Sequence, residues 1–291
     1  MTIAVASGKG GTGKTFFATN LFITLHQQNF RVQLIDCDAE APDALIFLKA
    51  TTGKAFDVIR PMPEINPALC TFCGKCHESC HFNAIFFLPQ FRMIHVMQEL
   101  CHSCGACLAV CPEGAVREHP ISLGQVTTYT LNEWAEIAEA KMKVGVMSPV
   151  PVIKEALRHI SQTAEIVLLD APPGNSCPFV HTVNSADFVV MITEPTPFGL
   201  SDLKQSIETL QELKKQFGVV INRAGTGNDD IYEYLKENDI PLLLEIPFSM
   251  DIARLYSRGI IAVEKMPALR KKFIQFTETI EELIGNRVYQ R

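Results

Sequence analysis

Short apolar runs alternate with amphipathic stretches along most of this chain. Six runs have the length and composition of buried strands, and they cover residues 3–6, 32–35, 166–169, 188–192, 219–221 and 242–246. Between most of them, apolar residues recur at helical spacing, over residues 16–27, 152–160, 202–215 and 229–237. This alternation predicts an α/β fold with a mostly parallel sheet and helices on both faces. A last amphipathic helix is predicted over about residues 268–284, with its apolar stripe packed on the sheet.

The alternation breaks between about residues 60 and 120. This stretch contains the pattern C-x-x-C-x-x-C-x-x-x-C twice, with an offset of 31 residues between the copies. The first copy is Cys70, Cys73, Cys76 and Cys80, and the second is Cys101, Cys104, Cys107 and Cys111. Pro61, Pro63 and Pro67 before the repeat, and Pro120 with Gly124 after it, favour domain joints. We therefore predict a duplicated small domain over residues 61–120, inserted into a larger domain formed by residues 1–60 and 121–291.

Cysteines at this spacing point to iron–sulfur chemistry. Three sulfurs from one run can converge on one [4Fe–4S] cluster, and in two-cluster ferredoxins the fourth ligand comes from the other run. The predicted ligand sets are Cys70, Cys73, Cys76 and Cys111 for one cluster, and Cys101, Cys104, Cys107 and Cys80 for the other. Zinc is the main alternative, although Cys₄ zinc sites usually use two separated pairs. His81 follows Cys80 where Pro112 follows Cys111, and we expect this histidine to be a surface or packing residue.

Composition narrows the choice of partners and compartment. Of 291 residues, 47% are hydrophobic and 20% are charged, which suits a globular protein with a sizeable core. A net charge of −6 and the lack of a long basic run argue against nucleic-acid binding. No apolar stretch approaches the roughly 18 residues of a membrane span, and the first residues do not resemble a secretory signal. We therefore expect a cytoplasmic location, where thiols ligate metals more often than they form disulfides.

Residues 8–15 form a phosphate-binding motif between a predicted strand and a predicted helix. They match G-x-x-x-x-G-K-[ST] and are Gly8, Lys9, Gly10, Gly11, Thr12, Gly13, Lys14 and Thr15. The glycines let backbone N–H groups surround phosphates, Lys14 would reach the β- and γ-phosphates, and the Thr15 hydroxyl would bind Mg²⁺. Because no guanine-binding signature is found, ATP is the expected nucleotide.

The additional lysine at Lys9 makes this loop resemble the deviant Walker A motif of the MinD/ParA superfamily. That group includes the nitrogenase iron protein and the Mrp-type cluster carriers. The resemblance implies an ATP-dependent homodimer, or a heterodimer with a similar ATPase, in which Lys9 reaches the partner's nucleotide. It also implies that Lys9, Lys14 and Asp38 act in hydrolysis, with Asp38 orienting the attacking water. Hydrolysis is expected to be slow without a partner.

Further motifs extend the resemblance over nearly the whole chain. The segment LIDCDAEAP resembles a first switch in which Asp36 supports Mg²⁺, and LLDAPPG resembles Walker B with a second switch, in which Asp170 holds the metal. Asn222, Arg223 and Pro247 match positions that hold the adenine in relatives. Taken together, the chain is similar to MinD-superfamily ATPases that contain an inserted ferredoxin domain.

Two cysteines lie outside the repeat. Cys37 is expected to be a buried small hydrophobic residue. Cys177 lies seven residues after Asp170, where the nitrogenase iron protein carries a cluster ligand, so transient metal or cluster binding there is a hypothesis. That relative uses a second cysteine in each subunit, and residues 145–153 of this chain contain none.

Three functions fit these observations. The first is ATP-gated electron delivery to a partner metalloprotein, to another redox acceptor, or to the maturation of such a protein. The second is an ATP-dependent scaffold or carrier for iron–sulfur clusters or other metallocofactors. The third is a positioning ATPase whose clusters sense redox state. Complete four-cysteine ligand sets favour electron storage over release of the same clusters, so electron delivery is preferred.

Overall fold

The chain forms two compact units. The computed structural model describes residues 1–288. Unit 1 comprises Met1–Phe56, Val126–Lys141 and the described residues from Pro149 onward, and unit 2 comprises Asp57–Gln125 and Met142–Ser148. Unit 2 is thus larger than the predicted insert at 61–120. The chain passes between the units within two long strands, β3 (Thr51–Ile65) and β6 (Val116–Asn132). Pro61, Pro63 and Pro120, which were expected at domain joints, lie inside these strands, whereas Gly124 adjoins the boundary after Gln125.

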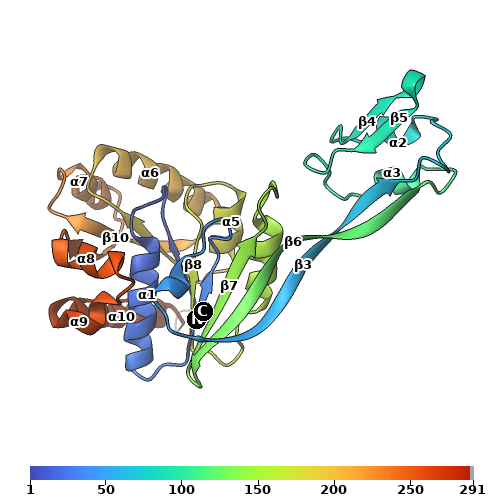
Figure 1. Cartoon of the computed structure of the whole chain (residues 1–291). Helices are drawn as coiled ribbons and strands as arrows, with labels where there is room; N and C mark the ends of the chain where they lie inside the picture. Colours follow the sequence, from blue (N-terminus) through green and yellow to red (C-terminus); the bar gives the residue numbers. More distant parts are fainter. Residues whose placement is uncertain (289–291) are drawn as a thin grey trace. The chain divides into compact units, whose positions relative to one another are not determined.

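Unit 1 is built on a sheet of nine strands in the order β11-β10-β9-β1-β8-β2-β7-β6-β3 (Figure 1). The strands from β11 to β7 pair in parallel. Besides β3 and β6, they are β1 (Thr2–Ala6), β2 (Val32–Asp36), β7 (Ala135–Met142), β8 (Ile166–Asp170), β9 (Phe188–Thr193), β10 (Gln216–Ala224) and β11 (Leu242–Pro247). All six predicted strands are present, and the prediction of an α/β fold with a mostly parallel sheet is confirmed.

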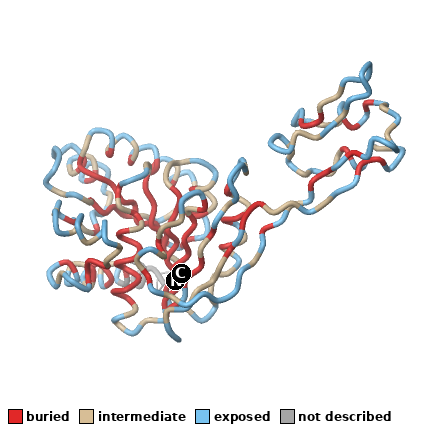
Figure 2. Tube along the Cα trace, viewed as in Figure 1, coloured by how far each residue is buried: buried red, intermediate tan, exposed pale blue. Residues whose placement is uncertain are grey.

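Helices cover both faces of this sheet. They are α1 (Lys14–Gln27), α4 (Val150–Arg158), α5 (Cys177–Asn184), α6 (Pro197–Glu212), α7 (Asp230–Glu237), α8 (Met250–Ser257), α9 (Ala262–Lys265) and α10 (Pro267–Val288), with the short turn η1 (Ala44–Ile46). Ile3 and Val5 of β1 share a core cluster with α1, α9 and α10, while Ala4, which points the other way, is also fully buried. Figure 2 shows this buried centre in red.

Helix α10 packs on the sheet domain, as its pattern predicts. Phe17 of α1 contacts Phe273 and Phe276 of α10, with ring centroids 5.2 and 5.1 Å apart. Leu269 and Ile280 complete the buried stripe, and the side chain of Leu283 lies outside the described residues. Within residues 1–288, no helix is long and apolar enough to cross a membrane.

The strands that the sequence did not predict lie at one edge of the sheet. Strands β6 and β7 form a hairpin through Glu133 and Trp134, and β6 is hydrogen-bonded to β3. In the part of β3 that belongs to unit 1, most residues are exposed, so it lacks an apolar run that could mark it as a strand. An edge strand also tolerates Pro61 and Pro63, because N–H groups on its outer side need no partner strand.

Unit 2 repeats one small motif with the 31-residue offset of its sequence. The repeated helices are α2 (Lys75–Glu78) and α3 (Ala106–Ala109), and the unit also contains the antiparallel strands β4 (Ile85–Leu88) and β5 (Met93–Val96) with the turn η2 (Pro89–Phe91). The N–H of Asn66 donates to the Ala115 carbonyl at 2.8 Å, and the equivalent Met97 N–H donates to Ala84 at 2.7 Å. The duplication therefore extends from sequence to backbone hydrogen bonding.

Candidate functional site

The phosphate-binding loop connects β1 to α1, and side chains of β10 donate hydrogen bonds to two of its carbonyl oxygens. The backbone of Gly11 and Gly13 has φ values of 78° and 97°, which glycine adopts without strain. The Asn222 side-chain amide donates to the Thr12 carbonyl at 2.7 Å, and the Arg223 guanidinium donates to the Gly11 carbonyl at 3.3 Å. No side chain caps the start of α1, so its first N–H groups remain available to a phosphate.

The two lysines of the loop lie in different surroundings. Lys14 is 7% exposed. Its positive charge lowers the pKa of Asp38 and of Asp170, so its ammonium group lies near these carboxylates. The Lys9 side chain is one-third exposed, and its Nζ lies 4.0 Å from a carboxylate oxygen of Glu194. Lys14 therefore belongs to the interior of the site, and Lys9 to its rim.

Glu194 is a residue of this site that sequence reasoning missed. It follows β9, its side chain is 12% exposed, and its carboxylate accepts a hydrogen bond from Arg223 at 2.6 Å. Its place after a buried strand at the carboxyl edge of the sheet could have drawn attention to it. The Glu194 carboxylate, through Arg223, supports the Gly11 carbonyl and so helps to fix the phosphate-binding loop.

The residues predicted to hold adenine lie at the ends of β10 and β11. Pro247 ends β11 and is paired in register with Ala224 of β10. The side chains of Asn222 and Arg223 donate hydrogen bonds to the phosphate-binding loop, so in this structure they fix the conformation of that loop. Contact between these residues and a base stays a prediction.

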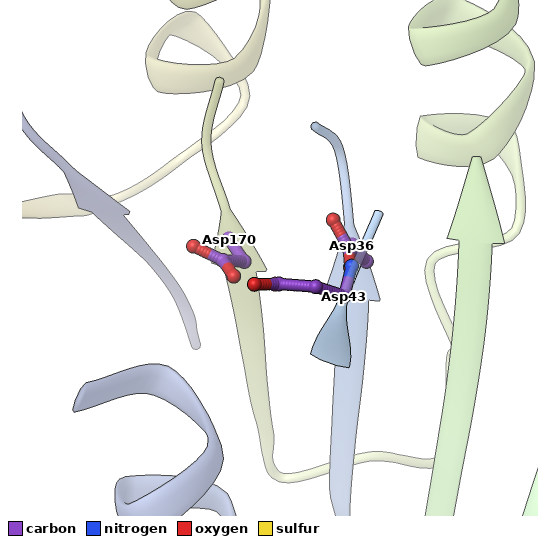
Figure 3. Close-up of side chains that lie close together, drawn as sticks. All are labelled: Asp36, Asp43 and Asp170. Carbon is purple, nitrogen blue, oxygen red and sulfur yellow. The ribbon is translucent and has the colours of Figure 1, made fainter. Parts of the chain in front are cut away.

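Carboxylates gather where β2 and β8 end. Oxygens of Asp36, Asp43 and Asp170 lie within 4.8 Å of one another (Figure 3). The Asp36 carboxylate accepts hydrogen bonds from the N–H groups of Asp38, Asp43 and Ala44 at 3.0–3.1 Å, and this shapes the loop after β2. Burial raises the pKa of Asp36 and of Asp38, which is half-buried beside the cluster.

Asp170 is the carboxylate of the site with the fewest hydrogen-bond partners. It is fully buried, and neither carboxylate oxygen has a hydrogen-bond partner among the described residues. Its pKa is raised from 3.8 to about 7: burial is the largest cause, Lys14 and the nearby Thr15 hydroxyl act in the opposite direction, and the charges of Asp43 and Asp38 add to the effect of burial. A buried carboxylate without a partner is costly, and a divalent cation next to Thr15 would satisfy it. The residues therefore fit the predicted Mg²⁺.

We expect Asp170→Asn to flatten the pH dependence of stability of the metal-free, nucleotide-free chain. Because the folded pKa of Asp170 lies above its ordinary 3.8, its contribution to stability is complete below about pH 4 and is lost as the pH rises through about 7. Over the whole interval this loss corresponds to roughly 4 kcal/mol, and about half of it falls above pH 5.5. Thermal unfolding in EDTA should show a lower Tm at pH 8 than at pH 5.5, and the variant should lose a clear part of that difference, the remainder coming from Asp36, whose pKa is also raised by burial. An unchanged pH slope in the variant would contradict this assignment.

Unit 2 brings the eight repeat cysteines together in two groups of four. One cavity is lined by Cys70, Cys73, Cys76 and Cys111. A second cavity is lined by Cys80, Cys101, Cys104 and Cys107. Each group thus combines three cysteines of one run with the last cysteine of the other. These are the sets that the sequence predicts, and their role as cluster ligands is taken up below.

Backbone geometry around the cysteines suits bound thiolates. Phe72 N–H donates to Cys70 Sγ at 3.4 Å, and the equivalent Ser103 N–H donates to Cys101 Sγ at the same distance. Both donor residues adopt a left-handed backbone, with φ of 57° and 52°, which turns their N–H groups toward the sulfur. Burial raises the pKa of the Cys107 thiol to about 11, a cost that metal ligation would offset. Burial also raises the pKa of the Cys111 thiol, but hydrogen bonds from nearby backbone N–H groups lower it by more, so the net pKa is below its ordinary value.

The two cavities differ at equivalent positions. The first is lined by Lys75 and Glu113, whereas the second has Ala106 and Phe82 in their places. His102 also lines the second cavity and stacks on Phe82, with ring centroids 3.9 Å apart. His81, the residue that departs from the ferredoxin pattern, is exposed.

The remaining cysteines lie in unit 1. Cys37 is fully buried, and burial together with Asp36 and Asp170 raises its pKa, as befits a packing residue. Cys177 is exposed and is the first residue of α5. Its proposed binding of metal stays a hypothesis.

These features define a nucleotide-binding P-loop protein: a glycine-rich loop lies between a strand and a helix, a lysine is buried beside it, and carboxylates lie at the carboxyl edge of a parallel sheet. Residues 3–263 match the CobQ/CobB/MinD/ParA nucleotide binding domain family, and the chain belongs to this family. An uncharacterized protein of Methanocaldococcus jannaschii is 30% identical over 286 residues, which cover 98% of each chain.

Two further proteins resemble the chain in its fold and in part of its sequence. The septum site-determining protein MinD of Pyrococcus horikoshii, solved with Mg-ADP, has the same fold, with a TM-score of 0.59 and 20% identity over 98% of each chain. The ferredoxin-type protein NapF of Escherichia coli is 43% identical over 47 residues, which are 15% of this chain and 29% of NapF.

Proposed function

We propose that this chain is a Mg²⁺-dependent ATPase that carries two [4Fe–4S] clusters and delivers electrons, under the control of ATP, to a partner metalloprotein or to its maturation. The observation that carries the proposal is the presence of two cavities, each lined by four cysteines, in a chain that belongs to a nucleotide-binding family. The short likeness to a ferredoxin-type protein supports the same view.

Each part of the nucleotide site has a proposed task. The loop amides and Lys14 bind the phosphates of ATP, while Thr15 and Asp170 hold Mg²⁺ and Asp36 supports its ligand shell. Asp38, which is only half-buried, orients the attacking water. Lys9, at the rim of the site, serves the nucleotide of a second copy of the chain, so the active form is an ATP-dependent dimer. When bound, Mg²⁺ would neutralise phosphate charge and the clusters would store electrons.

The cysteine sets favour electrons over clusters as the delivered species. A cluster held by four cysteines exchanges electrons without losing a ligand, whereas a carrier has to release its cargo. In unit 1 the only exposed cysteine among the described residues is Cys177, which alone cannot hold a cluster. We therefore place electron delivery first and cluster delivery second. A cytoplasmic location, without nucleic-acid or membrane partners, is part of the proposal.

A transfer experiment separates these functions. The anaerobically purified chain, reduced with dithionite and freed of excess reductant, is mixed with a one-electron acceptor dye or with an apo-ferredoxin, with and without Mg-ATP. Electron delivery predicts faster dye reduction with Mg-ATP while the chain keeps its iron. Transfer of iron to the apo-ferredoxin would instead support the carrier. Zinc without any cluster absorbance in the purified chain would contradict both functions.

A further inference from the structure

Asp43 is a carboxylate that neither the motifs nor the proposed function explains. It lies in the loop between β2 and η1, seven residues after Asp36, and its side chain is half-buried. Its backbone N–H donates to Asp36 Oδ2 at 3.0 Å, which fixes the position of the residue. Its Oδ2 accepts a hydrogen bond from the Tyr256 hydroxyl at 3.5 Å, and among residues 1–288 no hydrogen bond to its Oδ1 is found. Figure 3 shows the Asp43 side chain extended toward Asp170.

Asp170 provides the independent evidence for a ligand at this place. Its two oxygens are buried, and within residues 1–288 they have no hydrogen-bond partner of good geometry, although the Thr15 hydroxyl is near; both face the Asp43 carboxylate. Two carboxylates this close repel each other unless a positive charge or a proton lies between them. Lys14 supplies part of that charge, but ATP would draw the lysine toward the phosphates.

Asp36 differs from the other two carboxylates because its oxygens are already engaged. Its Oδ2 accepts two backbone hydrogen bonds and its Oδ1 accepts one, which leaves little free acceptor capacity. Its main task is to place Asp43 and to turn the loop. The oxygens free to bind a cation therefore come from Asp170 and Asp43, with the Thr15 hydroxyl beside Asp170.

We propose that Asp43 and Asp170, with Thr15, form a divalent-cation site that binds Mg²⁺ before the nucleotide arrives. Oxygens within 4.8 Å of one another can converge on a single ion, and hard oxygen donors suit Mg²⁺ or Mn²⁺. The half-buried Asp43 gives the ion access from solvent. In this arrangement the cation is already in place when ATP phosphates enter the loop. This site rests on the proposed function. To that function it adds Asp43 as a metal ligand and the binding of Mg²⁺ before ATP.

The test uses Mn²⁺ as the probe and EPR of free aqueous Mn²⁺ as the readout. The cluster-loaded chain is titrated anaerobically without nucleotide, so that its unit 2 thiolates are occupied. We expect about one tight Mn²⁺ per chain, and at least a tenfold weaker affinity in Asp43→Asn. Glu237→Gln, which removes an equal charge from the exposed surface of α7, should bind Mn²⁺ like the wild type. Circular dichroism and thermal unfolding establish that both variants are folded.

A parallel titration with ATP in EDTA separates this inference from the proposed function. If ATP binds but Mn²⁺ binds only in its presence, or if Asp43→Asn binds Mn²⁺ as tightly as the wild type, the cation site is overturned and the ATPase proposal stands. If the wild-type chain fails to bind ATP both in EDTA and with Mn²⁺, the proposed function fails, whatever Asp43 does.

Discussion

The Cys111→Ala variant should lose about half of its iron, and the iron lost should belong to the site formed with Cys70, Cys73 and Cys76. The reason is the crossed arrangement, in which the last cysteine of each run lines the cavity of the other run. Cys80→Ala should lose the other half. Iron content and cluster absorbance of the anaerobically purified variants measure this directly.

Double variants make the crossed arrangement testable against ligation within each run. Cys111→Ala combined with Cys70→Ala should lose no more iron than Cys111→Ala alone, because both residues serve one site. Cys111→Ala combined with Cys101→Ala should lose nearly all cluster iron. The reverse pattern would show that each run holds its own cluster and would contradict the assignment.

Lys14→Ala should lower the affinity for Mg-ATP roughly 30-fold to several thousand-fold. Removing one partner of a buried charge pair costs about 2–5 kcal/mol, and Lys14 is the buried cation of the phosphate site. The loss of its charge also leaves Asp38 and Asp170 less well compensated. Isothermal titration with Mg-ATP measures the effect, and an affinity within about threefold of the wild type would contradict the assigned role.

Lys9→Ala is the matched control for this variant. Lys9 lies at the rim, beside Glu194, and its proposed partner is the nucleotide of a second copy. Its removal should leave the affinity for Mg-ATP within a few-fold of the wild type and should abolish ATP-dependent dimerisation, as measured by light scattering. If Lys9→Ala loses affinity as severely as Lys14→Ala, both lysines act on the same nucleotide.

Much of the fold could be predicted because its signals are local. Buried parallel strands read as continuous apolar runs, and the phosphate-binding loop and the cysteine repeat have fixed spacings. Strands β3, β6 and β7 escaped prediction. The edge strand β3 is largely exposed in unit 1, β6 alternates buried and exposed residues without a continuous apolar run, and Pro61 and Pro63 suggested joints instead.

The candidate site was predictable only in part. Asp36, Asp38 and Asp170 directly follow or end strands, so topology alone brings them to one edge of the sheet. Asp43 and Glu194 depend on how loops fold back, and no sequence periodicity reports this. The contacts of Asn222 and Arg223 with the phosphate-binding loop join residues more than 200 positions apart, and only the folded chain shows them.

In the proposed function, nucleotide bound by unit 1 controls the redox state of the clusters in unit 2. The most direct test is an anaerobic redox titration of the cluster-loaded chain, followed by EPR, with Mg-ATP, with Mg-ADP and without nucleotide. We expect Mg-ATP to change the midpoint potential of the clusters in the wild type and to leave it unchanged in Lys14→Ala. Identical titrations under all three conditions in the wild type would contradict it.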